Sequence, residues 1–182
     1  MIIEPGTVLL DQRLRISFQR YPETAFSAQA SPQSHGPLPV ALSKNGCPFV
    51  PLAPGEALWI GLRVAKPDGP VTVRVTFLSN SESAEHPEHL AKKEAGAHDS
   101  SLVIIWHVTT HTGSAAPIVR ASRQGNIGYT FIDVSFPVAS APQTQLTRRF
   151  HLCSYEEFSA ATGAAPPDPI ETATVYGGWL LP

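Results

Sequence analysis

Apolar side chains recur at every second position over much of this chain, and this alternation limits the possible folds more than any other feature. In the segment "VTVRVTFL", Val73, Val75 and Phe77 alternate with threonines and an arginine. Successive side chains of a β-strand point to opposite faces of the sheet, so the pattern predicts a strand with one apolar face. The preceding segment "ALWIGLRVA" has the same period, and a Pro-Asp-Gly turn sequence lies between the two. We therefore expect both segments to be strands and to pair as a hairpin.

Further strands are predicted by the same alternation. They lie at 13–18, 129–136, 146–153 and 172–182, with short edge strands beside prolines at 39–42 and 49–52. The run "SLVIIWHV" at 101–108 differs because it is apolar on both faces. A strand of this kind is typical of the centre of a sheet that is covered on both sides.

The expected fold is all-β, a β-sandwich or jelly roll of about 7–9 mostly antiparallel strands. We expect a single domain over residues 1–182. One short exposed helix is predicted near 86–96, since Pro87 suits a first helical position and Gly96 can end a helix. The segment "SYEEFSAATG" predicts a shorter helical turn that ends at Gly163.

Charge and composition exclude several classes of partner. The formal net charge is −2 and the basic residues are scattered, so we expect neither nucleic acid nor a membrane surface as a partner. Charged residues make up only 15% of the chain, well below the roughly 25% of ordinary soluble domains. A thinly charged surface favours contact with other copies of the chain, so we expect a soluble oligomer.

The cellular compartment is predicted from the first residues and from the two cysteines. The segment "MIIEPGTVLL" has an acid and a proline where a signal peptide needs a positive start and an unbroken apolar run. We therefore expect a cytoplasmic protein. Cys47 and Cys153 are far apart in the sequence, and in a reducing compartment they are expected to be free thiols unless the fold brings them together.

Histidines suggest a possible metal site at two places. His107 and His111 are four residues apart, but on a regular strand that spacing separates them by about 13 Å. They reach one ion only if the strand ends between them. His86 and His89 share a face of the predicted helix near several glutamates, and His98 follows. The five histidines form one zinc or iron site if the fold brings them together, and otherwise they are ordinary strand and surface residues.

Aromatic and arginine side chains occupy the strand positions opposite the main apolar stripe. These residues are Trp59, Arg63, Arg74, Tyr129 and Phe131. Exposed aromatic rings beside arginines stack on planar ligands or sugars and supply binding energy at protein interfaces. A second packing layer that covers them is the alternative.

We therefore expect a non-catalytic binding or assembly module that uses this aromatic and arginine face. Its partner is expected to be a protein, including copies of the chain itself, or a carbohydrate. No cofactor is expected. The alternative function is a metal-dependent enzyme with zinc or iron in a small β-barrel-like fold. A ligand pocket between two sheets is a third possibility that the sequence does not distinguish from a filled core.

Overall fold

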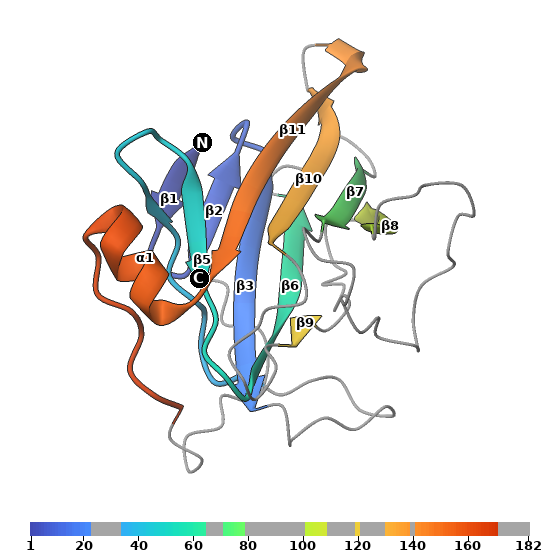
Figure 1. The fold of residues 1–182 in the computed structure, drawn as a ribbon. Helices are drawn as coiled ribbons and strands as arrows, with labels where there is room; N and C mark the ends of the chain where they lie inside the picture. The colour runs from blue at the N-terminus through green and yellow to red at the C-terminus, as the bar shows by residue number, and fades with distance from the viewer. Residues whose placement is uncertain are drawn as a thin grey trace.

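The computed structural model describes residues 1–22, 34–64, 71–78, 101–108, 119–120, 130–138 and 141–170 of the chain. These residues are mostly β and form two sheets (Figure 1). The five-stranded sheet has the order β1 (Ile2–Glu4), β2 (Thr7–Leu10), β3 (Leu14–Pro22), β6 (Glu56–Val64) and β9 (Val119–Arg120). The six-stranded sheet has the order β4 (Ala41–Leu42), β5 (Pro48–Pro51), β11 (Ala141–Cys153), β10 (Phe131–Val138), β7 (Val71–Leu78) and β8 (Ser101–Val108).

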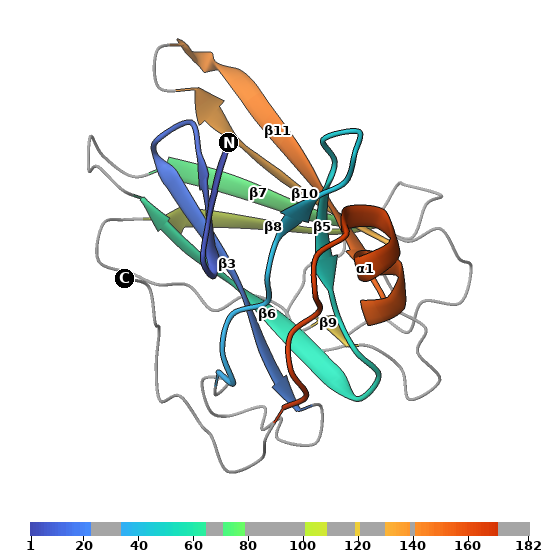
Figure 2. The ribbon, with the colours of Figure 1, turned by 90° about the vertical axis from the view of Figure 1, so that its left-hand side faces the viewer.

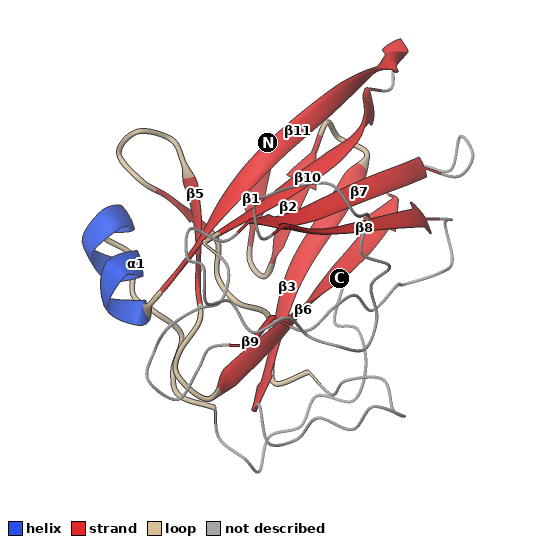
Figure 3. Cartoon of the chain, turned by 45° about the vertical axis from the view of Figure 1, so that its right-hand side comes forward, coloured by secondary structure: helices blue, strands red, loops and turns tan. Residues whose placement is uncertain are grey.

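Figure 3 shows the strands of the two sheets in red. Both sheets contribute side chains to one hydrophobic core. The five-stranded sheet supplies Ile16 and Ile60, and the six-stranded sheet supplies Val134. Phe18 of β3 meets Phe150 of β11 edge to face, with ring centroids 5.1 Å apart. The described strand pairs are antiparallel except the pair of β5 and β11, which is parallel. The prediction of a mostly antiparallel all-β fold is therefore confirmed.

The alternation predicts correctly which side chains face the core. In β7, Val73, Val75 and Phe77 are fully buried, whereas Thr72 and Arg74 are exposed and Thr76 is half-buried. In β10, Ile132, Val134 and Phe136 are likewise buried and the residues between them are half-buried. Residues 56–62 of β6 and 16–21 of β3 differ, because they are buried on both faces. Side-chain period thus identifies the side chains of these strands that enter the shared core.

The predicted hairpin between β6 and β7 is wrong. Both segments are strands, but β6 pairs with β3 and β9 in one sheet, and β7 pairs with β10 and β8 in the other. The chain therefore passes from one sheet to the other between them. Alternation identifies the apolar face of a strand but not its neighbour, and two strands that share a core can lie in facing sheets as well as in one.

The apolar run 101–108 is a strand, as predicted, but its position in the sheet differs from the prediction. Within the part of the chain that the structure describes, β8 lies at the edge of the six-stranded sheet and pairs with β7 alone. His107 of β8 is the register partner of Thr72. An apolar sequence indicates cover above and below a strand and says little about neighbours within the sheet.

Helix α1 (Tyr155–Thr162) confirms the helical turn predicted to end at Gly163. The Ser154 hydroxyl accepts a hydrogen bond from the Glu157 amide at the helix start. Gly163 ends the helix with φ 73°, a left-handed conformation that favours glycine. The helix lies beside β5 (Figure 2). Phe158 of the helix packs with Phe49 and Cys153. Among the described residues, no helix is both long enough and apolar enough to cross a membrane.

Two predicted elements lie outside the described residues. They are the helix near 86–96 and the last strand at 172–182. Cys47 is exposed and Cys153 is buried, and neither forms a disulfide. The prediction of two free thiols is therefore confirmed.

Candidate ligand-binding face

The six-stranded sheet turns a second set of side chains away from the core. In β10, Ile132, Val134 and Phe136 are fully buried, so the residues between them lie on the opposite face. Their register partners in β11 lie on that face too. We call this surface the outer face, and it is defined by three cross-strand pairs: Phe131 with His151, Asp133 with Arg149, and Ser135 with Thr147.

Planar side chains gather at one end of the outer face. The rings of Phe131 and His151 lie with centroids 4.9 Å apart and planes inclined at 34°. The Arg149 guanidinium carbon lies 5.1 Å from the centre of the Phe131 ring, within the range of a cation–π contact. On the other side of His151, the ring of Phe49 lies 4.5 Å away and is only 9% exposed. Phe131 is half-buried, so part of this residue remains accessible to solvent.

Asp133 holds the guanidinium of Arg149 in a fixed orientation. Arg149 Nε donates to Asp133 Oδ1 and Nη2 donates to Oδ2, both over 2.7 Å. This two-bond geometry is the strongest arrangement of an arginine and a carboxylate. Hydrogen bonding to Asp133 raises the pKa of Arg149. The Arg149 side chain remains 55% exposed, so donors not used by Asp133 are available to a ligand.

A shallow hollow of about 370 Å³ lies further along the same face. It is lined by Thr72 and Arg74 of β7, Ser135 of β10 and Gln145 of β11. Arg74 is the register partner of Ser135, whose hydroxyl lies 2.8 Å from that of Thr147. The hollow therefore adjoins the third cross-strand pair of the outer face.

The five aromatic and arginine residues predicted from the sequence are divided between the two sheets. Arg74 and Phe131 lie on the six-stranded sheet, at the hollow and at the planar group. Trp59 and Arg63 lie on β6 of the five-stranded sheet. Trp59 is only 2% exposed and packs with Tyr21 and Ala57, whereas Arg63 is exposed. Tyr129 lies outside the described residues.

The sequence reasoning did not select Asp133, Arg149 or His151. A signal for them was present, because alternation with the buried Phe150 places Arg149 and His151 on the face away from the core. Their partners were not predictable, because the pairing depends on the register of β10 with β11.

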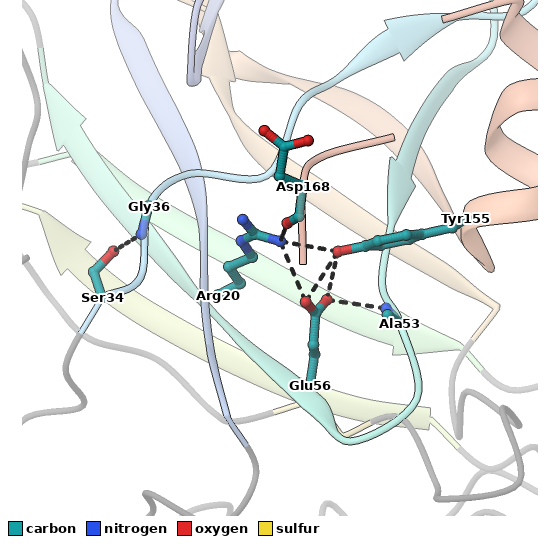
Figure 4. Close-up of polar contacts among 7 residues, drawn as sticks. All are labelled: Arg20, Ser34, Gly36, Ala53, Glu56, Tyr155 and Asp168. Atoms are coloured by element: carbon teal, nitrogen blue, oxygen red, sulfur yellow. Dashed lines mark hydrogen bonds and ion pairs between the residues drawn. The ribbon is translucent and has the colours of Figure 1, made fainter. Parts of the chain in front are cut away.

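A second polar cluster lies in the interior and joins β3, β6 and α1 (Figure 4). Arg20 Nη1 donates to Glu56 Oε1 over 3.2 Å, to the Tyr155 hydroxyl over 3.0 Å and to the Asp168 carbonyl over 2.7 Å. The Tyr155 hydroxyl lies 3.0 and 2.9 Å from the two Glu56 oxygens, and the Ala53 amide donates to Oε2 over 3.0 Å. Burial, aided by the nearby Glu56 charge, raises the pKa of Tyr155.

This interior cluster joins β3, β6 and α1, which are distant in the sequence, through hydrogen bonds. Arg20 and Glu56 are buried, and their charges are compensated by one another and by hydrogen bonds. Arg20 Nε is buried without a hydrogen-bond partner among the described residues, whereas Nη1 and both Glu56 oxygens have partners within the protein. We therefore assign the cluster a structural role.

The structure places one of the five candidate metal ligands. The backbone of His107 lies in β8, whereas His86, His89, His98 and His111 are outside the described residues. The described ranges contain no group of three or more His, Cys, Asp and Glu residues suited to a metal ion. The zinc or iron site therefore stays a prediction.

Comparison of the chain with protein-family models, with curated proteins and with solved structures found no match.

Proposed function

We propose that this chain is a non-catalytic binding module with a β-sandwich fold, and that its outer face binds carbohydrate. The observation that carries this proposal is the planar group formed by Phe131, His151 and Arg149, next to hydroxyl and carboxylate groups on the same two strands. The sandwich architecture is supported by the core that both sheets share.

Sugar rings have two kinds of surface, and the outer face offers a partner for each. The C–H groups on a sugar face carry a slight positive charge and pack well on the negative face of an aromatic ring such as Phe131. The sugar hydroxyls need fixed donors and acceptors. Arg149 and Asp133 hold one another in place and retain unused donors and acceptors, while Ser135 and Thr147 supply hydroxyls.

A protein partner, including a second copy of the chain, fits this face less well. The centre of a protein interface is usually apolar and dry. Among the described residues the exposed large hydrophobic side chains are Met1, Ile2 and Leu42, and none of them lies on the outer face. The alternating hydroxyl, charged and aromatic groups of the outer face are better suited to a hydroxyl-rich ligand.

The reactive groups near this face are held in unreactive states, which supports binding without catalysis. The Asp133 carboxylate is committed to Arg149 by two hydrogen bonds. Burial raises the pKa of the Cys153 thiol to about 12, so its nucleophilic thiolate is scarce at neutral pH.

A glycan array tests the proposal. The wild-type chain is expected to bind a subset of glycans, and Phe131→Ala is expected to reduce that binding at least tenfold. Arg63→Gln is the matched control, because Arg63 is exposed on the other sheet, and it is expected to bind like wild type. Circular dichroism must show that both variants keep the β fold. Absence of any bound glycan, or equal binding by Phe131→Ala, contradicts the proposal, and light scattering that shows self-association through this face replaces it with assembly.

A further inference from the structure

We propose that the hollow beside Arg74 binds the oxyanion of an acidic carbohydrate, either a carboxylate or a sulfate ester. This inference rests on the proposed carbohydrate-binding function and adds the class of sugar. It concerns a place on the outer face that is separate from the planar group at Phe131.

The composition of the hollow favours an anion. Its described lining consists of one guanidinium, from Arg74, two hydroxyls, from Thr72 and Ser135, and one carboxamide, from Gln145. All four groups can donate hydrogen bonds, and no carboxylate is among them. Guanidinium groups match the geometry of carboxylate and sulfate oxygens through two parallel hydrogen bonds.

The charge of Arg74 is also uncompensated in the described ranges. The ion pairs there are made by Arg15, Arg20, Arg149 and His151, and none involves Arg74. The neighbouring cross-strand pair of the outer face has no net charge, because Asp133 forms an ion pair with Arg149. A ligand that lies along the face therefore meets a positive charge at the hollow that no described residue pairs with, and a balanced ion pair beside it.

The spacing of the two places predicts the size of the ligand. Ser135, at the hollow, and Phe131, at the planar group, are four residues apart on β10, so about 13 Å separates them along the strand. This distance exceeds one sugar ring. The predicted ligand is therefore an oligosaccharide with one ring packed on Phe131 and an acidic group at Arg74.

The test compares neutral glycans with their carboxylated and sulfated counterparts, using wild type, Arg74→Gln, Phe131→Ala and Arg63→Gln. Wild type is expected to bind an acidic form roughly five to ten times more tightly than the neutral form, as one partly exposed charge contact allows. Arg74→Gln is expected to remove this preference and keep the neutral binding. Arg63→Gln loses the same charge from the other sheet and is expected to keep the preference. The preference is expected to shrink as salt is raised.

The outcomes separate this inference from the proposed function. Equal binding of acidic and neutral forms by wild type, or an unchanged preference in Arg74→Gln, overturns the acidic-sugar inference while Phe131-dependent binding still supports a carbohydrate module. Absence of any glycan binding by wild type overturns both the acidic-sugar inference and the proposed carbohydrate-binding function. Binding of polyglutamate without binding of any acidic glycan overturns the inference in favour of an acidic peptide. The carboxylated and sulfated arms show which oxyanion the hollow accepts.

Discussion

Single side chains determine how the interior polar cluster and the two thiols behave. Arg20 and Glu56 are buried, and Tyr155 from the distant helix α1 reaches both of them. Removing a hydrogen-bond donor from a buried carboxylate lowers the stability of the folded protein, because water does not reach the carboxylate to replace the donor. The Tyr155 hydroxyl is therefore worth more than an exposed hydrogen bond.

We predict that Tyr155→Phe lowers the free energy of unfolding by about 1–3 kcal/mol, since it leaves the Glu56 carboxylate short of one donor. Urea denaturation measures this change. Glu156→Gln on the same helix is the control, because Glu156 is exposed, and it should shift stability by less than about 0.5 kcal/mol. Equal effects of the two substitutions contradict a structural role for the cluster.

The two thiols are predicted to react at very different rates. Cys47 is exposed, whereas Cys153 is buried beside Phe49 and Phe158, and burial raises its pKa to about 12. Labelling of the folded protein at neutral pH should modify Cys47 quickly and Cys153 only when the protein unfolds. In Cys47→Ser the fast phase should disappear, and a fast phase that persists in this variant refutes the assignment.

Among the connections between elements, the turn between β2 and β3 carries backbone strain. Asp11 and Gln12 have φ of 47° and 54°, and the Arg13 amide donates to the Leu10 carbonyl over 3.0 Å. Two positive φ angles in succession define a turn that favours glycine at its second central position. Glutamine there is less favourable than glycine, because its Cβ crowds the backbone.

We predict that Gln12→Gly raises the free energy of unfolding by about 0.5–1 kcal/mol, the relief of left-handed strain less the greater chain entropy of glycine. Thermal and urea denaturation measure the change. Gln12→Ala keeps the strain and should give no gain. A loss of stability in the glycine variant shows that the turn does not hold this conformation.

Strands and helix ends were easier to predict from the sequence than the pairing of strands within the sheets. The apolar faces of β3, β7 and β10 follow from alternation, and Gly163 marks the end of α1. The pairing of β6 with β3 did not follow, because facing sheets and hairpins bury the same stripe. The Asp133–Arg149 pair was equally hidden, since it depends on the register of two strands.

In the whole molecule, the aromatic and arginine residues predicted from the sequence are divided between two sheets, and the two sheets expose them differently. The planar group and the hollow lie together on the six-stranded sheet, at the level of β7, β10 and β11. On the five-stranded sheet, Trp59 is covered and Arg63 is exposed. The sequence predicted that aromatic and arginine residues matter, and the fold assigns Arg74 and Phe131 to one surface.

The most direct test of the central claim is a nuclear magnetic resonance titration of the labelled chain with a glycan identified on the array. The account predicts that amide resonances of β10 and β11 around Phe131, Asp133 and Arg149 shift on addition of the glycan, whereas those of β3 and β6 stay unchanged. Shifts confined to the five-stranded sheet, or no shifts in β10 and β11, would contradict binding at the outer face.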